Sequence, residues 1–129
     1  MRKRLILDTC ALVWLTTGDK MLSLEAIEAI NSASLVYVSP ISAWEISMKV
    51  AQNKIRWALS PQEWFFNAVK KHTLHILPLS VELLIKASEL PWHHRDPADR
   101  FIIAGAMLNE LTIVTQDQKF FDYGVPILS

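Results

Sequence analysis

Four carboxylates in this sequence occupy positions from which a fold could bring them together. Asp8 and Asp117 each follow a short apolar run rich in strand-forming residues, and Glu45 and Asp99 lie in segments with helical periodicity. Carboxylates held close together repel one another, so they stay ionised together only around a cation, and otherwise some of them take up protons. The chemistry to look for is therefore cation binding.

The residue types also limit which cation would fit. The chain has a single cysteine, Cys10, and four histidines, so a zinc site built from several cysteines is excluded. Carboxylate oxygens favour Mg²⁺, with Mn²⁺ as a substitute, and such ions retain water and bind phosphate oxygens. A site of this kind can activate a water for attack on a phosphodiester and stabilise the leaving oxygen. That chemistry is typical of a nuclease.

Asp8, Glu45 and Asp117 also have purely structural interpretations. Asp8 and Asp117 could each cap the helix or turn that follows it. Glu45 could form an ordinary ion pair with Lys49 one helical turn later, worth only a few tenths of a kcal/mol at the surface. The helical pattern predicts an apolar stripe of Ile41, Trp44 and Met48, with Glu45 near its edge.

Two further aspartates lie at the start of one helix. Asp96 precedes Pro97, which favours a helix start there, so Asp96 is expected to be the N-cap. Asp99 lies in the first turn, near the positive end of the helix dipole, and shares a face with apolar residues of the next turns. We therefore expect Asp96 to cap and Asp99 to point toward the sheet as a site residue.

The elements that must position these carboxylates alternate along the chain. Short apolar runs predict strands near 5–7, 35–38, 74–77 and 112–115, with a final edge strand at 125–128. Periodicity and capping residues predict helices near 10–16, 40–51, 61–71, 80–90 and 97–109, and one that begins at 24 and repeats through 30. Strands separated by helices predict a single three-layer α/β/α domain over residues 1–129, with a mostly parallel sheet of about five strands. The carboxyl ends of parallel strands meet at one edge, where such sheets bind ligands.

Composition narrows the class of protein. Apolar residues make up 51% of the 129 residues, and Lys plus Arg balance Asp plus Glu at 13 each, which excludes a disordered chain and a broadly basic nucleic-acid binder. Asp8 interrupts the first apolar run, and no apolar stretch reaches the roughly 18 residues that a membrane span needs. We expect a cytoplasmic protein without a membrane partner, in keeping with the lone cysteine.

Four stretches, in this order and spacing, resemble the motifs of the PIN-domain family, and specifically of VapC-type toxins of type II toxin-antitoxin systems. They are Leu5–Thr9, Ser42–Lys49, His94–Arg100 and Thr115–Asp117. The resemblance implies a Mg²⁺-dependent endoribonuclease toxin that cuts RNA, is neutralised by a cognate antitoxin protein and forms a homodimer. It also implies a PIN-like fold with a parallel sheet flanked by helices.

By that resemblance the acidic residues acquire roles. The catalytic metal ligands would be Asp8, Glu45, Asp99 and Asp117, with Asp96 and Thr115 as auxiliaries. Either Asp96 or Asp99 could be the third ligand, and Asp117 is the less constant of the four in such proteins. The runner-up hypothesis is a non-catalytic Mg²⁺-binding or protein-interaction domain of the same fold.

An acidic site that cuts RNA still has to attract a polyanion. Lys49, Arg95 and Arg100 are the expected phosphate contacts, which would make binding depend on salt. The adjacent His93 and His94 are interpreted as loop residues rather than metal ligands. A group of aromatic residues in the middle of the chain is interpreted mainly as core, with an exposed groove for a partner as the alternative. These are Trp57, Trp64, Phe65 and Phe66.

Overall fold

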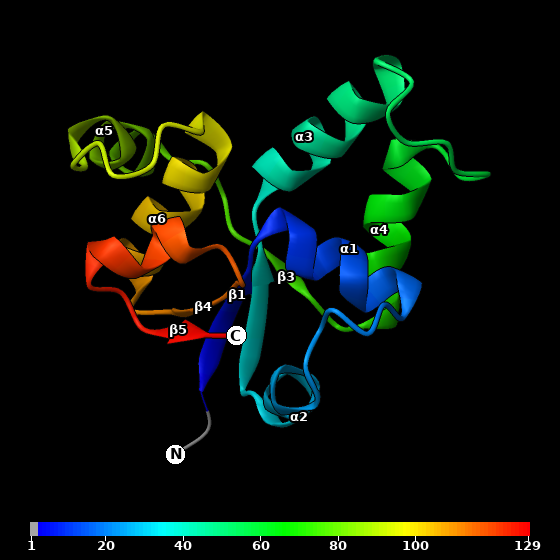
Figure 1. Ribbon diagram of the computed structural model, residues 1–129, viewed down its shortest axis with the longest axis horizontal. Helices are drawn as coiled ribbons and strands as arrows, with labels where there is room; N and C mark the ends of the chain where they lie inside the picture. The colour runs from blue at the N-terminus through cyan, green and yellow to red at the C-terminus, as the bar shows by residue number, and fades with distance from the viewer. Residues whose placement is uncertain (1–2) are drawn as a thin grey trace.

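The computed structural model describes residues 3–129 and contains one five-stranded sheet in which every pairing is parallel. The strand order is β3-β2-β1-β4-β5, so β1 lies at the centre (Figure 1). The strands are β1 (Arg4–Leu7), β2 (Leu35–Val38), β3 (His75–Ile76), β4 (Thr112–Val114) and β5 (Ile127–Leu128). The predicted parallel sheet of about five strands is confirmed, with β5 at an edge as expected.

Helices connect the strands in the predicted alternation. They are α1 (Thr9–Thr17), α2 (Leu24–Ser32), α3 (Pro40–Ala51), α4 (Pro61–Lys71), α5 (Val81–Glu89), α6 (Pro97–Asn109) and the 3₁₀ helix η1 (Gln118–Tyr123). Local signals account for several starts. Ser23 and Ser80 each accept a bond from a first-turn N–H, and Ser60 forms a complete capping box with Glu63. The predicted boundaries differ from the observed ones by only one or two residues at most ends.

The two faces of the sheet bury two separate cores, because alternate residues of β1 point in opposite directions. Leu5 and Leu7 pack with residues of α1, α2, α3 and α4, whereas Ile6 packs with residues of α5, α6 and η1. Figure 1 shows the two groups of helices on either side of the sheet. The expected three-layer α/β/α arrangement is confirmed.

Helix α3 faces the core differently from the prediction. Trp44 is 56% exposed and Met48 39% exposed, whereas Ser42 and Ile46 are the buried residues of the helix. The expected stripe was therefore wrong, because it weighted the bulkiest apolar side chains, and packing instead favours small Ser42 where α3 approaches α1. The rotation turns Glu45, next to buried Ile46, toward the carboxyl edge of the sheet.

The aromatic residues of the middle region are mostly core. Trp64 and Phe65 are buried in α4, and the ring of Trp57 lies 5.2 Å from that of Trp64. Phe66 is 55% exposed and is the one of the four that faces outward. Among the described residues, no helix is both long and apolar enough to cross a membrane.

Candidate metal centre

The candidate site lies where the direction of chain winding reverses. From β1 the chain proceeds to β2 and β3 on one side, then returns to place β4 and β5 on the other. The gap between the carboxyl ends of β1 and β4 is the switch point, where open α/β sheets bind ligands. Asp8 follows β1 there, and its backbone N–H donates to the Val114 carbonyl at 3.1 Å.

Asp8 is both a helix cap and a site residue. One carboxylate oxygen accepts the Ala11 backbone N–H at 2.7 Å, which caps α1, and the other accepts the Thr115 hydroxyl at 2.5 Å. The residue is 5% exposed. The two interpretations of Asp8 therefore hold together, and Thr115 is placed as a partner that orients the Asp8 side chain.

Glu45 lies on α3 and is held at the site by a contact with α1. The Thr9 hydroxyl lies 2.8 Å from the Ser42 hydroxyl and donates a hydrogen bond to Glu45 Oε1. The alternative ion pair is not formed, since within residues 3–129 no Lys49 nitrogen lies within 4.0 Å of a Glu45 oxygen. Glu45 is thus held by a hydroxyl network that spans two helices.

The start of α6 separates its two aspartates as expected. Asp96 is the N-cap, and its side chain accepts the Ala98 backbone N–H at 3.0 Å. Asp99, one turn further, has a side chain only 15% exposed and turns toward the switch point. Asp96 remains close enough for its charge to raise the pKa of Asp99.

Asp117 arrives from the opposite side of the cleft. Its backbone N–H donates to the Thr115 hydroxyl at 3.1 Å, and one carboxylate oxygen caps η1 by accepting the Lys119 N–H at 3.0 Å. Its other oxygen faces the site, and the side chain is 40% exposed. Asp117 is therefore more exposed to solvent than Asp99.

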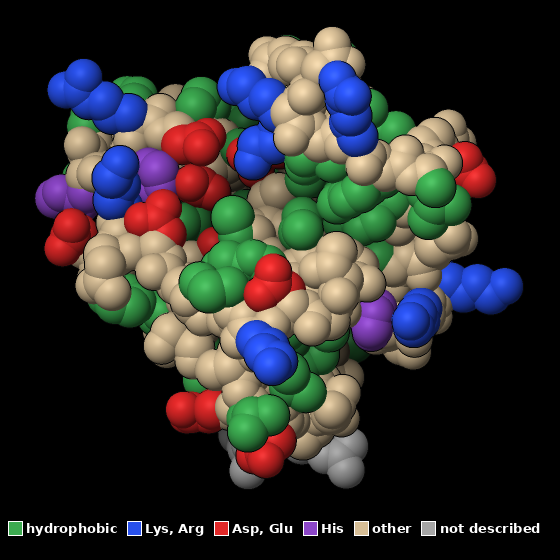
Figure 2. Space-filling model, turned by 45° about the vertical axis from the view of Figure 1, so that its right-hand side comes forward, with side chains coloured by type: hydrophobic (Ala, Val, Ile, Leu, Met, Phe, Trp, Pro, Cys, Tyr) green, Lys and Arg blue, Asp and Glu red, His purple; other side chains and the backbone are tan. Residues whose placement is uncertain are grey.

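These carboxylates line one cleft of about 480 Å³. Figure 2 shows acidic side chains gathered in a hollow, with basic side chains on its rims. The lining residues are Asp8, Thr9, Cys10, Trp14, Met21, Glu45, Lys49, Asp96, Asp99, Gln116 and Asp117. All four carboxylates singled out in the sequence thus open into the same space.

The raised pKa values of the carboxyl groups in the cleft indicate that little positive charge compensates them. Burial, together with the charges of the neighbouring carboxylates, raises the pKa of Asp99 to about 8; these are Asp96, Glu45, Asp8 and Asp117. Burial likewise raises the pKa of Asp8 to about 6, opposed by its bonds from Thr115 and Ala11, and it raises the pKa of Glu45. Strongly perturbed carboxylates in a cleft are typical of functional sites.

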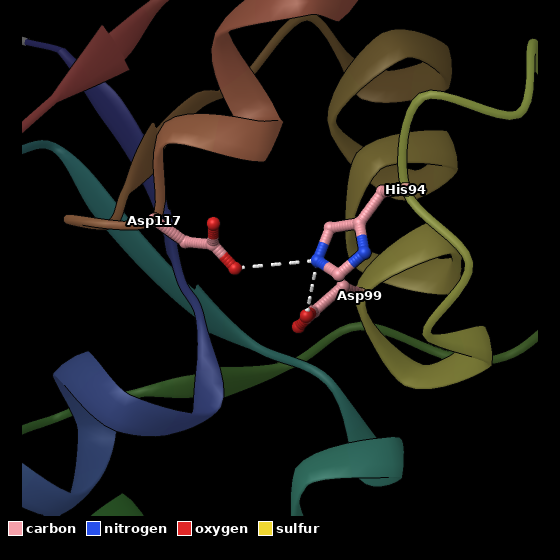
Figure 3. Close-up of side chains that lie close together, drawn as sticks. All are labelled: His94, Asp99 and Asp117. Carbon is pink, nitrogen blue, oxygen red and sulfur yellow. Dashed lines mark ion pairs between the residues drawn. The ribbon is translucent and has the colours of Figure 1, made fainter.

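His94 is a member of the site that the sequence interpretation missed. It is 5% exposed, and its Nε2 lies 2.7 Å from Asp99 Oδ2 and 3.3 Å from Asp117 Oδ2 (Figure 3). Both histidines lie in the loop before α6, as expected, but His94 is buried against two carboxylates whereas His93 is exposed. No sequence signal distinguishes two adjacent histidines, because the path of the loop decides which one turns inward.

The expected phosphate contact by Arg100 was wrong. Its guanidinium is buried, 3% exposed, and donates to the carbonyls of Ala87, Leu90, Pro91 and His94 at 2.7–3.1 Å. The ring of Trp92 covers its outer side at 3.7 Å. Arg100 fixes the loop between α5 and α6, whereas Lys49 lines the cleft and Arg95 is exposed, as a phosphate contact requires.

Replacing Arg100 should therefore affect stability more than RNA binding. Arg100→Leu would remove the guanidinium donor from four carbonyl groups, of which that of Pro91 keeps the Tyr123 hydroxyl, and each buried unsatisfied group costs about 1–3 kcal/mol. We expect the free energy of unfolding to fall by about 3 kcal/mol or more, measured by urea denaturation. Arg95→Leu, in which an exposed neighbour is changed in the same way, should unfold like the wild type. Equal stability of both variants would contradict the structural role of Arg100.

The donor set fits a hard divalent cation. One oxygen each of Asp99 and Asp117 lies within 4.8 Å of the other and of His94 Nε2, and Asp8 and Glu45 line the same cleft, so the candidate ligands are four carboxylates with an imidazole beside them. Most of these donors are carboxylate oxygens, the ligands that Mg²⁺ and Mn²⁺ accept. The raised pKa values of Asp8 and Asp99 also fit a cation site. Both carboxyl groups are buried near other acidic groups, with too little positive charge nearby to stabilise their ionised forms.

Fold and cleft together define a doubly wound α/β domain with an acidic cleft at its switch point. Residues 5–126 match the sequence pattern of the PIN domain. The chain belongs to the PIN domain family, as the motif resemblance implied.

Similarity to known proteins extends over nearly the whole chain. It is 28% identical over 123 residues to Ribonuclease VapC22 of Mycobacterium tuberculosis, covering 94% of this chain and 92% of that protein. The fold is similar to that of VapBC2 from Rickettsia felis bound to a promoter DNA fragment, with a TM-score of 0.73, 17% identity and 97% of both chains covered. DNA-bound VapBC from Salmonella typhimurium gives a TM-score of 0.70 at 18% identity, covering 98% and 97%.

Proposed function

We propose that this chain is a Mg²⁺-dependent endoribonuclease toxin of the VapC kind. The observation that carries the proposal is the convergence of Asp8, Glu45, Asp99 and Asp117 on one cleft, where the pKa of two of them is strongly raised. Membership of the PIN domain family and similarity to a protein named Ribonuclease VapC22 support it.

The residues of the cleft would have different roles. Asp8, Glu45, Asp99 and Asp117 would hold Mg²⁺, or Mn²⁺ in its place. When bound, such an ion supplies an activated water and charge stabilisation of the leaving oxygen in phosphodiester hydrolysis. Thr115 and Thr9 orient Asp8 and Glu45 through the hydroxyl bonds described above. Asp96 acts as an auxiliary that caps α6 beside the site.

The rim of the cleft would bind the RNA backbone. Lys49 lines the cleft and Arg95 is exposed beside Asp96, so both can meet phosphates without entering the metal centre.

Lys49→Ala should weaken RNA binding without changing its sequence preference, because phosphate contacts carry no sequence information. Each lost phosphate contact lowers the dependence of log affinity on log salt by about 0.7 for single strands. Fluorescence anisotropy with a labelled RNA in Ca²⁺, at several salt concentrations, measures both quantities. Lys70→Ala, an exposed change on α4, is the control, and an equal effect of both variants would exclude a specific role for Lys49.

A cognate antitoxin and a second subunit belong to the same proposal. The similar folds from Rickettsia felis and Salmonella typhimurium are described as VapBC assemblies, which supports an antitoxin protein as the partner here. We also propose a homodimer, which sedimentation equilibrium would test, since a purely monomeric species contradicts it. A toxin that cuts RNA would act in the cytoplasm.

The test of the proposed function is cleavage of a mixed RNA pool by the purified protein. We expect cutting with Mg²⁺ or Mn²⁺, none with EDTA, and recovery when the cation is restored. Cutting that persists in EDTA would contradict metal dependence. If no RNA is cut under any condition, the non-catalytic alternative, a Mg²⁺-binding or protein-interaction domain, would replace the enzyme.

A further inference from the structure

A hydrogen bond from the backbone determines which ring nitrogen of His94 carries the proton. Nδ1 accepts the backbone N–H of Asp96 at 3.3 Å. A ring nitrogen that accepts a hydrogen bond carries no proton, so the neutral ring holds its proton on Nε2. The Nε2–H group is buried and lies between one oxygen of Asp99 and one of Asp117, at 2.7 and 3.3 Å.

Neither carboxylate is in line with this N–H, and Nε2 has no well-aligned hydrogen-bond partner within the described residues. The Nε2–H group therefore lies between the two carboxylates and attracts both electrostatically, without forming a linear hydrogen bond to either. Figure 3 shows the imidazole bridging the gap between α6, which carries Asp99, and the segment after β4, which carries Asp117. The two carboxylates have no other described side chain between them with a donor.

The position of His94 is fixed from three sides. Its backbone N–H donates to the Tyr123 hydroxyl at 2.8 Å, and that hydroxyl donates to the Pro91 carbonyl at 2.7 Å. The Arg100 guanidinium donates to the His94 carbonyl at 3.1 Å, and the ring packs edge-on against Phe120 at 5.6 Å. Tyr123 and Phe120 belong to η1, so His94 joins the elements on both sides of the cleft.

We propose that His94 is a positioning residue whose Nε2–H holds the carboxylates of Asp99 and Asp117 side by side before a cation binds. This inference rests on the proposed function, because it assigns the pair to a metal site. The side chain of Asp117 is partly exposed, so without the donor it would turn toward solvent, and repulsion by Asp99 adds to this whenever Asp99 is ionised. Outer partners that orient metal ligands are typically worth 10–100-fold in metal affinity.

Direct ligation by Nε2 is the competing arrangement, and the structure disfavours it. A ligand nitrogen needs its lone pair free, so the proton would move to Nδ1. Two N–H groups, from Nδ1 and from Asp96, would then face each other across 3.3 Å. The donor role requires no such conflict.

The test compares two substitutions of His94 by titrating Mn²⁺ against the full chain with EPR detection. His94→Leu removes the donor, and we expect at least about tenfold weaker Mn²⁺ binding. His94→Gln places an amide N–H₂ near the former Nε2, and we expect it to restore most of the affinity. His93→Gln, at the exposed neighbour, is the matched control and should bind as the wild type does.

Two spectroscopic measurements on the wild-type chain test the role of His94 directly. NMR of protein labelled with ¹⁵N-histidine should find the His94 proton on Nε2 and none on Nδ1, and the reverse tautomer would overturn the proposal. Electron spin echo spectra of the Mn²⁺ complex should lack the coupling of a directly bound imidazole. A directly bound imidazole nitrogen, identified by the same label and lost in His94→Gln, would make His94 a ligand instead.

The remaining outcomes separate the two proposals. If His94→Leu binds Mn²⁺ as tightly as the wild type, the positioning role is wrong while the carboxylate site stands. If the wild type itself binds no Mn²⁺, the proposed metal-dependent function fails, and the positioning role fails with it.

Discussion

Asp8→Asn should reduce metal-dependent RNA cleavage by about a thousandfold or more, and Asp99→Asn should do the same. Each substitution keeps the shape of the side chain but removes a charge from the cleft and replaces a ligand oxygen by an amide nitrogen. Groups that act as one catalytic unit typically lose most of the rate when any one is removed. Initial rates of cutting of one RNA, at saturating Mg²⁺, measure the effect.

The double variant Asp8→Asn/Asp99→Asn makes the prediction sharper. If both residues serve one metal centre, the double variant should be hardly slower than either single one, because the first change already disables the unit. Asp122→Asn, an exposed aspartate of η1, is the matched control and should cut at the wild-type rate. Full activity in Asp8→Asn would show that the cutting activity comes from elsewhere in the preparation.

Stability without metal should fall as pH rises from about 4 to about 8. In the unfolded chain the pKa of Asp99 is near 3.8, whereas in the folded chain burial raises it to about 8. Between these values the folded state holds a proton that the unfolded state has released, so folding is favoured less at each higher pH and the loss levels off above 8. Asp8, with a pKa raised to about 6, acts in the same direction between about 4 and 6.

Two changes should reverse this loss of stability at high pH, namely removal of the charge of Asp99 and binding of a cation beside it. The carboxylates of Asp8, Glu45, Asp96 and Asp117 raise its pKa, and among the described residues His94 lies against it. Asp99→Asn removes the buried charge, so at pH 8 without metal we expect the variant to melt several degrees above the wild type. Mg²⁺ should raise the melting temperature of the wild type, more at pH 8 than at pH 5, and hardly that of the variant.

Thermal unfolding followed by circular dichroism, with EDTA or with Mg²⁺ and at pH 5 and pH 8, measures these differences in melting temperature. Asp122→Asn should follow the wild type at both pH values. A variant Asp99→Asn that is less stable than the wild type at pH 8 without metal would contradict the buried, uncompensated charge. The predicted gain in stability with loss of activity is typical of residues kept for function.

The sequence by itself determined the features that depend on near neighbours. The apolar run before Asp8 predicts a buried strand, and the caps at Ser23, Ser60 and Asp96 follow from bonds within three residues. Such signals are local because each depends on the backbone of the same turn. They were sufficient to place the carboxylates at one edge of a parallel sheet.

Only the tertiary structure decided which way several side chains face. Trp44 is exposed because Ser42 meets Thr9, which lies 33 residues away, and Arg100 is buried because carbonyls of the preceding loop surround it. His94 turns inward because Tyr123, 29 residues away, holds its backbone. These contacts join residues distant along the chain, and neither composition nor periodicity records them. The helices and the acidic edge could therefore be predicted, while the donor between Asp99 and Asp117 could not.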